Sequence, residues 1–186
     1  MDTLKCCDDW SSMLKSILFT EEEIYHKIDE LAKQLSEKYA GKEVLCVGLM
    51  NGCVMFLTHL LKKVTFKYKL DTMVVSSYGH STETSGTIRI KKDLNIDPAG
   101  RDVLIIEDLI DTGTTLNWIK QYLESKKCNS ITFCCLLDKK ERRLVNVDVD
   151  YVGFTCPNEF VVGFGMDYQD EYRCLPFIGC IDITKI

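Results

Sequence analysis

The sequence predicts an α/β protein built on a central, mainly parallel sheet that is flanked by helices. Three short runs, 44–49 (VLCVGL), 103–106 (VLII) and 130–137 (SITFCCLL), are apolar along most of their length, which is typical of parallel strands covered on both faces. The first two are each followed by a turn of small or polar residues and then by a helical pattern, as in a βα unit. A chain of 186 residues can bury a sizeable core, so we expect a single domain over residues 1–186.

The composition excludes several classes of protein. The formal net charge of −5, without a long basic block, argues against non-specific binding to nucleic acid. No apolar run reaches the length of a membrane span, and the start of the chain, MDTLKCCDDW, lacks the apolar core of a signal peptide. We therefore expect a cytoplasmic protein whose ten cysteines are reduced. No Cys-x-x-Cys pair occurs, so a zinc site is not expected.

Local patterns predict the remaining elements. Thr20 and Glu23 form a capping box at the start of a helix, and the apolar face of that helix continues to near Gly41. The polar, glycine-flanked stretch 77–86 (SYGHSTETSG) predicts a loop. A second helix is expected at 54–61, and further strands at 65–76, 87–90, 151–155 and 175–182.

The predicted chemistry lies in the stretch 103–116 (VLIIEDLIDTGTTL). Glu107, Asp108 and Asp111 arrive where the apolar run stops, so the strand is expected to end at these acids. Buried carboxylates need partners, and ribose hydroxyls or a divalent cation would serve. The hydroxyls and backbone N–H groups of 112–115, which open a helix, suit a phosphate. This pattern favours a nucleotide or sugar-phosphate site at the carboxyl end of the strand over a simple helix cap in a solvated loop.

The stretch 107–115 (EDLIDTGTT) resembles the phosphoribosyl pyrophosphate (PRPP) signature of the type I phosphoribosyltransferases. Its residues are most similar to those of the 6-oxopurine branch, the hypoxanthine-guanine phosphoribosyltransferases. The resemblance extends from about Thr20 to Asp182. It implies the type I phosphoribosyltransferase fold, with a small hood over the base site contributed by the N-terminal segment and residues 156–186.

The resemblance also implies an activity. A phosphoribosyl group would pass from PRPP to N9 of a 6-oxopurine (hypoxanthine, guanine or xanthine), giving a purine nucleoside monophosphate and pyrophosphate with the help of Mg²⁺. The implied assembly is a homodimer or a homotetramer. No sequence pattern identifies the interface.

In the resembling family, the acidic stretch binds the sugar phosphate. Glu107 and Asp108 would hold the ribose hydroxyls and, with Asp167, the magnesium shell. Because adjacent strand residues point to opposite faces, Glu107 and Asp108 can reach one sugar only if the strand ends between them. Asp111 would be the general base that takes the N7 proton. The 5′-phosphate would bind to Thr112, Gly113, Thr114 and Thr115.

The pyrophosphate contacts are carried over from three segments. Met50, Asn51 and Gly52 match the pyrophosphate loop, where a cis peptide between Met50 and Asn51 is expected, although many relatives have a basic residue in place of Asn51. An ordinary tight turn at Asn51-Gly52 is an equal alternative. Ser77 and Tyr78 match a lid over the reacting centre, with an exposed hairpin linker as the alternative, and Arg173 matches a residue that reaches the pyrophosphate.

The purine contacts come from two segments. Lys139 matches a family lysine that donates to O6 of the base and so rejects an amino purine, whereas Lys140, Glu141 and Arg142 are interpreted as a solvated charged face. Phe160 would stack on the purine, although a core phenylalanine is more common in general. The remaining implied purine contacts are Val161, Met166 and Asp167.

Two other readings of the chain remain. A non-catalytic regulator could keep the PRPP-binding fold and bind nucleic acid or a partner, but the acidic net charge and the retained Asp111 and Lys139 count against it. A receiver-like or dinucleotide-binding domain would share the pattern of strand and acid. It would not explain DTGTT at 111–115, and no G-x-G-x-x-G follows the first strand.

Overall fold

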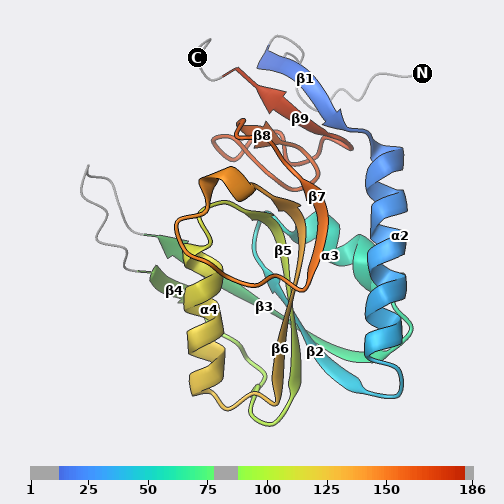
Figure 1. Cartoon of the computed structure of the whole chain (residues 1–186), viewed down its shortest axis with the longest axis vertical. Coiled ribbons are helices and arrows are strands. Elements are labelled where there is room, and N and C mark those ends of the chain that lie inside the picture. Colours follow the sequence, from blue (N-terminus) through green and yellow to red (C-terminus); the bar gives the residue numbers. More distant parts are fainter. Residues whose placement is uncertain (1–12, 78–87, 183–186) are drawn as a thin grey trace.

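The computed structural model describes residues 13–77 and 88–182. Its centre is a six-stranded sheet of order β4-β3-β2-β5-β6-β7, in which β3 and β4 pair antiparallel and the other neighbours pair parallel (Figure 1). This confirms the predicted mainly parallel sheet. The strands are β2 (Glu43–Leu49), β3 (Lys67–Ser77), β4 (Ile88–Lys92), β5 (Asp102–Ile110), β6 (Ser130–Asp138) and β7 (Tyr151–Thr155).

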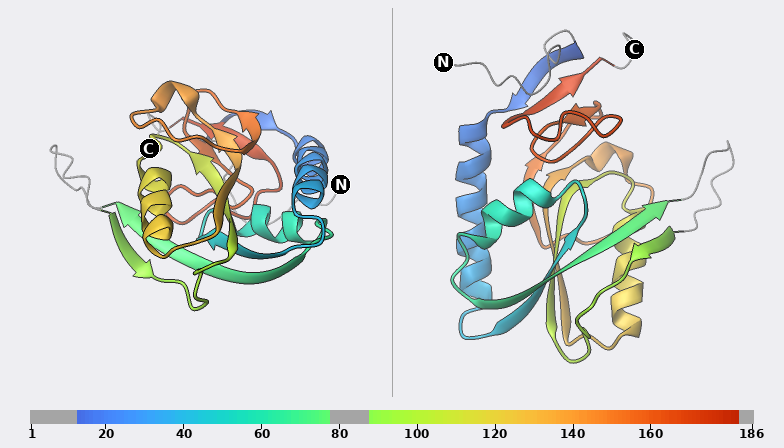
Figure 2. Two further views of the ribbon diagram at one scale, coloured as in Figure 1. Left: turned by 60° about the horizontal axis from the view of Figure 1, so that its bottom comes forward. Right: turned by 180° about the vertical axis from the view of Figure 1, so that it is seen from behind.

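Helices cover both faces of this sheet. Helices α2 (Glu21–Lys38) and α3 (Val54–Leu61) pack on one face, and α4 (Thr114–Ser125) packs on the other (Figures 1 and 2). Successive side chains of β2 point to opposite faces of the sheet. Val44 packs in the apolar cluster that includes α2 and α3, and Leu45 packs in the cluster that includes α4. Since α3 follows β2 and α4 follows β5, the connections diverge between these neighbouring strands. Ligands of open α/β sheets bind at such a point, outside the carboxyl ends of the strands.

The predicted capping box at the start of α2 is confirmed. Thr20 Oγ1 accepts a hydrogen bond from Glu23 N at 3.3 Å, and Glu23 Oε2 accepts one from Thr20 N at 2.8 Å. The apolar face is buried as expected, and the helix ends at Lys38, shortly before Gly41 with φ +74°. Within residues 13–77 and 88–182, none of the helices combines the length and hydrophobicity that a membrane span requires.

A second, three-stranded antiparallel sheet stands beyond the main sheet, at the top of Figure 1. It consists of β1 (Leu14–Phe19), β9 (Ile178–Ile181) and β8 (Val161–Val162), in the order β1-β9-β8. We call these three strands and the loops 156–160 and 163–177 the hood. The sequence analysis did not predict β1 as a strand, because its hydrogen-bonding partner β9 lies at the other end of the chain.

The expected end of β5 was wrong. The strand does not stop at the acids but continues to Ile110, and its ladder with β6 pairs Glu107 with Cys135 and Ile110 with Asp138. The physical reason is that β6 remains apolar and extended just as far, so its backbone continues to supply ladder partners. The expectation that the strand ends between Glu107 and Asp108 was therefore wrong as well.

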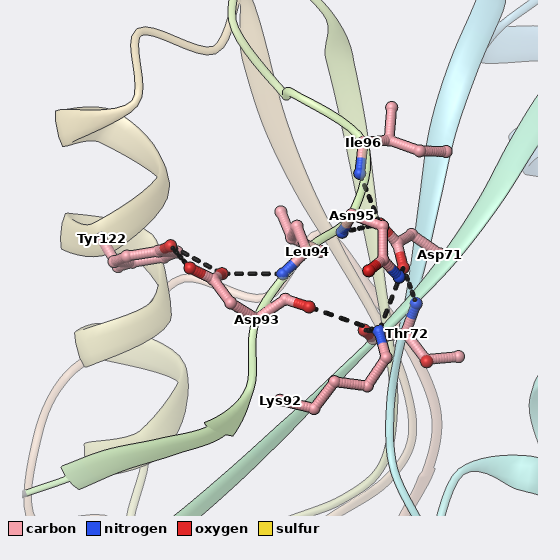
Figure 3. A network of polar contacts seen from close by, with 8 residues as sticks. All are labelled: Asp71, Thr72, Lys92, Asp93, Leu94, Asn95, Ile96 and Tyr122. Atoms are coloured by element: carbon pink, nitrogen blue, oxygen red, sulfur yellow. Dashed lines mark hydrogen bonds and ion pairs between the residues drawn. The ribbon is translucent and has the colours of Figure 1, made fainter.

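A buried carboxylate fastens the antiparallel edge of the sheet (Figure 3). Asp71 on β3 is 6 % exposed. Its oxygens accept hydrogen bonds from Thr72 N (2.8 Å), Asn95 N (2.6 Å), Ile96 N (2.9 Å), Asn95 Nδ2 (3.2 Å) and Lys92 Nζ (3.2 Å). The neighbouring Asp93 accepts from Tyr122 Oη of α4 at 2.6 and 2.7 Å. This Asp71 network ties the segment after β4 to β3 and to α4.

Candidate active site

A cavity of about 650 Å³ lies between the carboxyl end of β5 and the hood. Asp108 and Asp111 line it from the side of the main sheet. The five residues predicted to contact the purine also line it, and they are Lys139, Phe160, Val161, Met166 and Asp167. The fold thus brings the proposed base contacts and two of the proposed sugar contacts into one space.

A smaller pocket of about 120 Å³ lies at the start of α4. Its lining includes Glu107, Asp111, Thr112, Gly113 and Thr115, whereas Thr114 is the first residue of the helix. Gly113 has φ +82°, a conformation that glycine adopts without strain. The first N–H groups of a helix have no partner within the helix, so this pocket offers donors to an anion. Asp111 lines both the pocket and the larger cavity and therefore stands at their junction.

The loop around this pocket is held by the segment after β6. Thr112 O accepts hydrogen bonds from Leu144 N at 3.0 Å and from Val145 N at 3.1 Å. A Cβ atom on Gly113 would lie 2.6 Å from Val145 O, so the backbones are in close contact there. The two loops at the carboxyl ends of β5 and β6 therefore form one packed unit.

Glu107 and Asp108 do not line the same space. Glu107 faces the smaller pocket and Asp108 faces the cavity. Burial, and then the adjacent Asp108 charge, raise the pKa of Glu107 well above its usual range. A protonated carboxyl donates as well as accepts hydrogen bonds, so Glu107 can contact a hydroxyl or a phosphate oxygen without repelling it.

The turn after β2 approaches both the sheet and the hood. The peptide bond between Met50 and Asn51 is cis, as the family resemblance implied. A Cβ atom on Gly52 would lie 1.9 Å from Asp108 Oδ2, and one on Gly165 would lie 2.1 Å from Gly52 O. Only glycine fits at these two positions without displacing its neighbours, so the turn packs directly on Asp108 and on the hood.

Lys139 is held in the cavity wall. Its backbone N donates to Ile110 O at 2.9 Å, and the residue is only 6 % exposed. Its ammonium makes no ion pair or hydrogen bond with any residue in the described ranges, which leaves it available to a ligand carbonyl. On the hood side, Phe160 is 39 % exposed, lines the cavity and forms a T-shaped pair with the Tyr168 ring at a centroid distance of 5.4 Å, so part of its ring is accessible to a ligand.

Arg173 makes contacts within the hood. Its Nη2 lies 2.8 Å from Asp167 Oδ1, and its Nη1 donates to Gly165 O at 2.9 Å. The predicted contact of Arg173 with pyrophosphate therefore stays a prediction. Ser77 is the last residue of β3, whereas Tyr78 and the rest of the predicted lid lie outside the described residues.

Arg142 is exposed, as expected for a solvated charged face, but it also belongs to the cavity. Arg142 lines the cavity, and its Nε lies 2.6 Å from Asp111 Oδ1. Lys140–Arg142 form a single 3-10 turn, in which residues three apart share a face, so Arg142 lies on the same side as Lys139. The spacing of three was visible in the sequence, but the type of turn was not. The other lining residues that the sequence analysis did not assign to the site are Lys15, Leu109, Asn158, Glu159, Ile181 and Asp182.

The carboxylates of the cavity suit a hard cation only in part. Asp108 and Asp167 line the same space, and carboxylate oxygens are the protein ligands that Mg²⁺ prefers. Among residues 13–77 and 88–182, no group of three His, Cys, Asp or Glu side chains is close enough to hold a metal. A magnesium ion would therefore fit here only with water and substrate oxygens completing its shell, which is its usual manner of binding beside phosphates.

A mainly parallel sheet with a phosphate-sized pocket after β5 and an antiparallel hood over the strand ends defines the type I phosphoribosyltransferase fold. Residues 16–169 match the family described as "Phosphoribosyl transferase domain". The chain belongs to this family.

Within the family, the chain is similar to hypoxanthine-guanine phosphoribosyltransferases. It is 45% identical to the enzyme of that name from Streptococcus agalactiae over 168 residues, which are 90% of this chain and 93% of the relative. A crystal structure of a hypoxanthine phosphoribosyltransferase from Staphylococcus aureus has a TM-score of 0.89 and 45% identity, covering 92% of this chain and 94% of that one. The chain also matches the bifunctional protein TilS/HprT of Listeria monocytogenes at 46% identity, but it spans only 26% of that relative's length.

Proposed function

We propose that the protein is a purine salvage enzyme that transfers the 5-phosphoribosyl group of PRPP to N9 of a 6-oxopurine. The observation that carries the proposal is the single cavity that is lined by Asp108, Asp111 and Lys139 from the strand ends and by Phe160 from the hood, next to a separate phosphate-sized pocket. The cavity has the volume of a nucleotide-sized site. The named relatives support the same reaction.

In the proposed reaction, the bond between C1 of the ribose and pyrophosphate breaks, and a bond from C1 to N9 of the base forms. Asp111 accepts the proton that leaves N7, which requires it to lie within hydrogen-bond reach of the base. Lys139 donates to O6 and stabilises the charge that grows there, and Phe160 stacks on the ring. Asp108 holds the ribose hydroxyls from the cavity. Because β5 continues past Glu107 and turns it toward the smaller pocket, Glu107 is not assigned to the same sugar.

The phosphates are assigned to two loops. The residues around the smaller pocket, Thr112 to Thr115, bind the 5′-phosphate through hydroxyls and the first N–H groups of α4. The turn of Met50, Asn51 and Gly52 binds pyrophosphate through its backbone, because Asn51 brings no positive charge. Asp108 and Asp167 would hold Mg²⁺, which when bound neutralises the departing diphosphate.

The direct test is an assay with PRPP, Mg²⁺ and each of hypoxanthine, guanine and xanthine. Formation of the corresponding nucleoside monophosphate with at least one base is expected, and adenine should not react because an ammonium donor at Lys139 cannot pair with its amine. A protein that forms no monophosphate from any of the three bases would contradict the proposal. The ratios of kcat/KM among the bases would identify the preferred substrate.

We further propose that the protein acts in the cytoplasm as a homodimer or homotetramer. All eight cysteines within the described residues are free, which fits a reducing compartment. The proposal of an oligomer rests on the family resemblance of the sequence alone, and light scattering after gel filtration would test it. A monomer at the working concentration would contradict it.

A further inference from the structure

The loop that follows β6 contacts the loop that follows β5 in the wall of the cavity. Arg142 Nε lies 2.6 Å from Asp111 Oδ1, and Arg142 Nη1 lies 3.4 Å from Asn158 Oδ1 on the hood side. One guanidinium therefore bridges residues that come from three separate segments of the chain. Both Arg142 and Asp111 keep part of their side chains exposed to solvent.

Asp111 Oδ1, the atom that contacts Arg142, has no second ion pair with the described residues. Asp111 Oδ1 is shielded from solvent and makes no hydrogen bond. A shielded carboxylate oxygen is unfavourable without a compensating charge, and among the described residues Arg142 supplies that charge. A further acid, Asp108, precedes Asp111 at the same strand end, and its negative charge would repel that of Asp111.

We infer that Arg142 is a positioning residue for Asp111: it holds the carboxylate at the junction of the cavity and the smaller pocket before the purine arrives. An ionised carboxylate has two oxygens, so a contact through Oδ1 leaves Oδ2 to accept the proton from N7. The guanidinium is a permanent cation, and since Asp111 Oδ1 accepts no hydrogen bond from it, the contact acts through its charge, which lysine can supply in part. This inference rests on the proposed function, because Asp111 acts as a base only in that reaction.

The neighbouring residues show why this arginine differs from the rest of its turn. Lys140 is exposed on the same 3-10 turn, and no ion pair of its side chain is found with the described residues. Arg143 turns away from the cavity to pair with Asp138, with Nη2 at 2.8 Å from Oδ1. Arg142 is thus the cation of this turn that pairs with the proposed base, and Lys140 offers a matched control.

The test is a double-mutant cycle of Arg142→Ala and Asp111→Asn, with Arg142→Lys and Lys140→Ala alongside. Arg142→Ala is expected to lower kcat about tenfold, less than the full effect of a general base, with the KM for PRPP little changed. In the Asp111→Asn background, the same substitution should have almost no further effect on kcat, because Arg142 acts through Asp111. Arg142→Lys should recover part of the loss, and Lys140→Ala should keep the activity of the unaltered protein.

The outcomes separate the two proposals. Losses in kcat that multiply in the double variant would overturn the inference, and so would an Arg142→Ala variant with unchanged kcat. A large fall in the melting temperature of Arg142→Ala with normal kcat per folded molecule would also overturn it, since it would show a structural role only. If the unaltered protein forms no nucleotide from any base, that result contradicts the proposed function itself, whatever the Arg142 variants show.

Discussion

Two regions of this chain hold carboxylates in opposite environments, one rich in hydrogen-bond donors and one poor in them. Asp71 is buried, and each of its oxygens accepts hydrogen bonds from backbone or side-chain donors (Figure 3). Burial alone would raise its pKa, but the N–H groups of Ile96, Thr72 and Asn95, together with Lys92, hold the pKa below its usual range. In contrast, Glu107 is left with a raised pKa beside Asp108.

The difference separates an acid whose partners all lie within the protein from acids that we propose bind a ligand. The donors around Asp71 come from the protein itself, so its contribution is complete in the free chain. The acids at the end of β5 face a cavity and a pocket, and among residues 13–77 and 88–182 they have fewer partners: Glu107 has the backbone and side chain of Asp108, and Asp111 has the Arg142 contact. Perturbed groups in a cleft are characteristic of functional sites.

The largest effect is expected for Asp111→Asn, which should remove activity without loosening the fold. If Asp111 is the general base, kcat should fall by about 10²- to 10⁴-fold. Binding of nucleoside monophosphate, measured by calorimetry, should be largely retained, and the free energy of unfolding should change by less than about 0.5 kcal/mol. Unchanged turnover would rule out the assigned role.

Asp71→Asn should have the reverse profile. The amide cannot satisfy the surrounding N–H groups and the ammonium together, so we expect a loss of about 3 kcal/mol in the free energy of unfolding. For a chain of this size that corresponds to a melting temperature lower by roughly 6–12 °C. Asp148→Asn, an exposed acid with no hydrogen bond among the described residues, is the control. Equal melting temperatures for the two variants would contradict the role given to Asp71.

The effect of Asp71→Asn on the free energy of unfolding should depend on pH. Because the folded pKa of Asp71 is lowered, its contribution is fully present above the unfolded pKa of about 3.9 and is lost as the pH falls through the folded value. The stability difference between the unaltered protein and Asp71→Asn should therefore shrink below about pH 4. Urea unfolding at a series of pH values would measure it.

Glu107→Gln should stabilise the ligand-free protein at neutral pH. The folded pKa of Glu107 is raised, so its stability contribution is full below the unfolded pKa of about 4.3 and declines as the pH rises through and beyond that value. Glutamine stays neutral and avoids this loss, and a gain of about 1 kcal/mol would raise the melting temperature by about 2–4 °C. Near pH 4 the two proteins should melt together. A variant that is less stable at pH 7.5 would show that Glu107 is ionised and well paired.

Tyr122→Phe should have the smallest effect. It removes the hydroxyl that donates to Asp93 but keeps the ring, which stacks on Trp118 at a centroid distance of 5.4 Å. A hydrogen bond near the surface contributes about 0.5–1 kcal/mol, so a fall of about 1–4 °C in the melting temperature is expected, with kcat unchanged. A larger fall would mean that the link from the Asp71 network to α4 carries more of the stability of this edge.

Elements that are determined by neighbouring residues in the sequence were predicted correctly. Strand β7 was predicted at 151–155 and has those bounds, and the capping residue of α2 was identified from the spacing of Thr20 and Glu23. Strand β1 and the far end of β5 were not predicted correctly, because both are fixed by hydrogen bonds to strands that are distant in sequence. Two acids after an apolar run indicate, from local sequence alone, that the strand ends at 107 and 108. The hydrogen-bonded ladder with β6 shows that the strand continues.

The candidate site divides in the same way. The signature at 107–115 and Lys139 were found from motif and position. Arg142 was missed because a charge run normally faces water, and its partner Asp111 is brought near only by packing of the two loops. Asp71 was missed for a similar reason, since all of its donors except Thr72 N lie more than twenty residues further along the chain.

The contact of Gly52 with Asp108 on one side and Gly165 on the other has a consequence for how substrates would influence one another. For an enzyme of the proposed kind, the turn that would grip the diphosphate and the hood that would cover the base are joined through bare backbone, with no side chain between them to absorb movement. Any displacement of the turn by one substrate must then alter the room offered to the other. By thermodynamic reciprocity, whatever factor PRPP contributes to the affinity for the base, the base contributes equally to the affinity for PRPP.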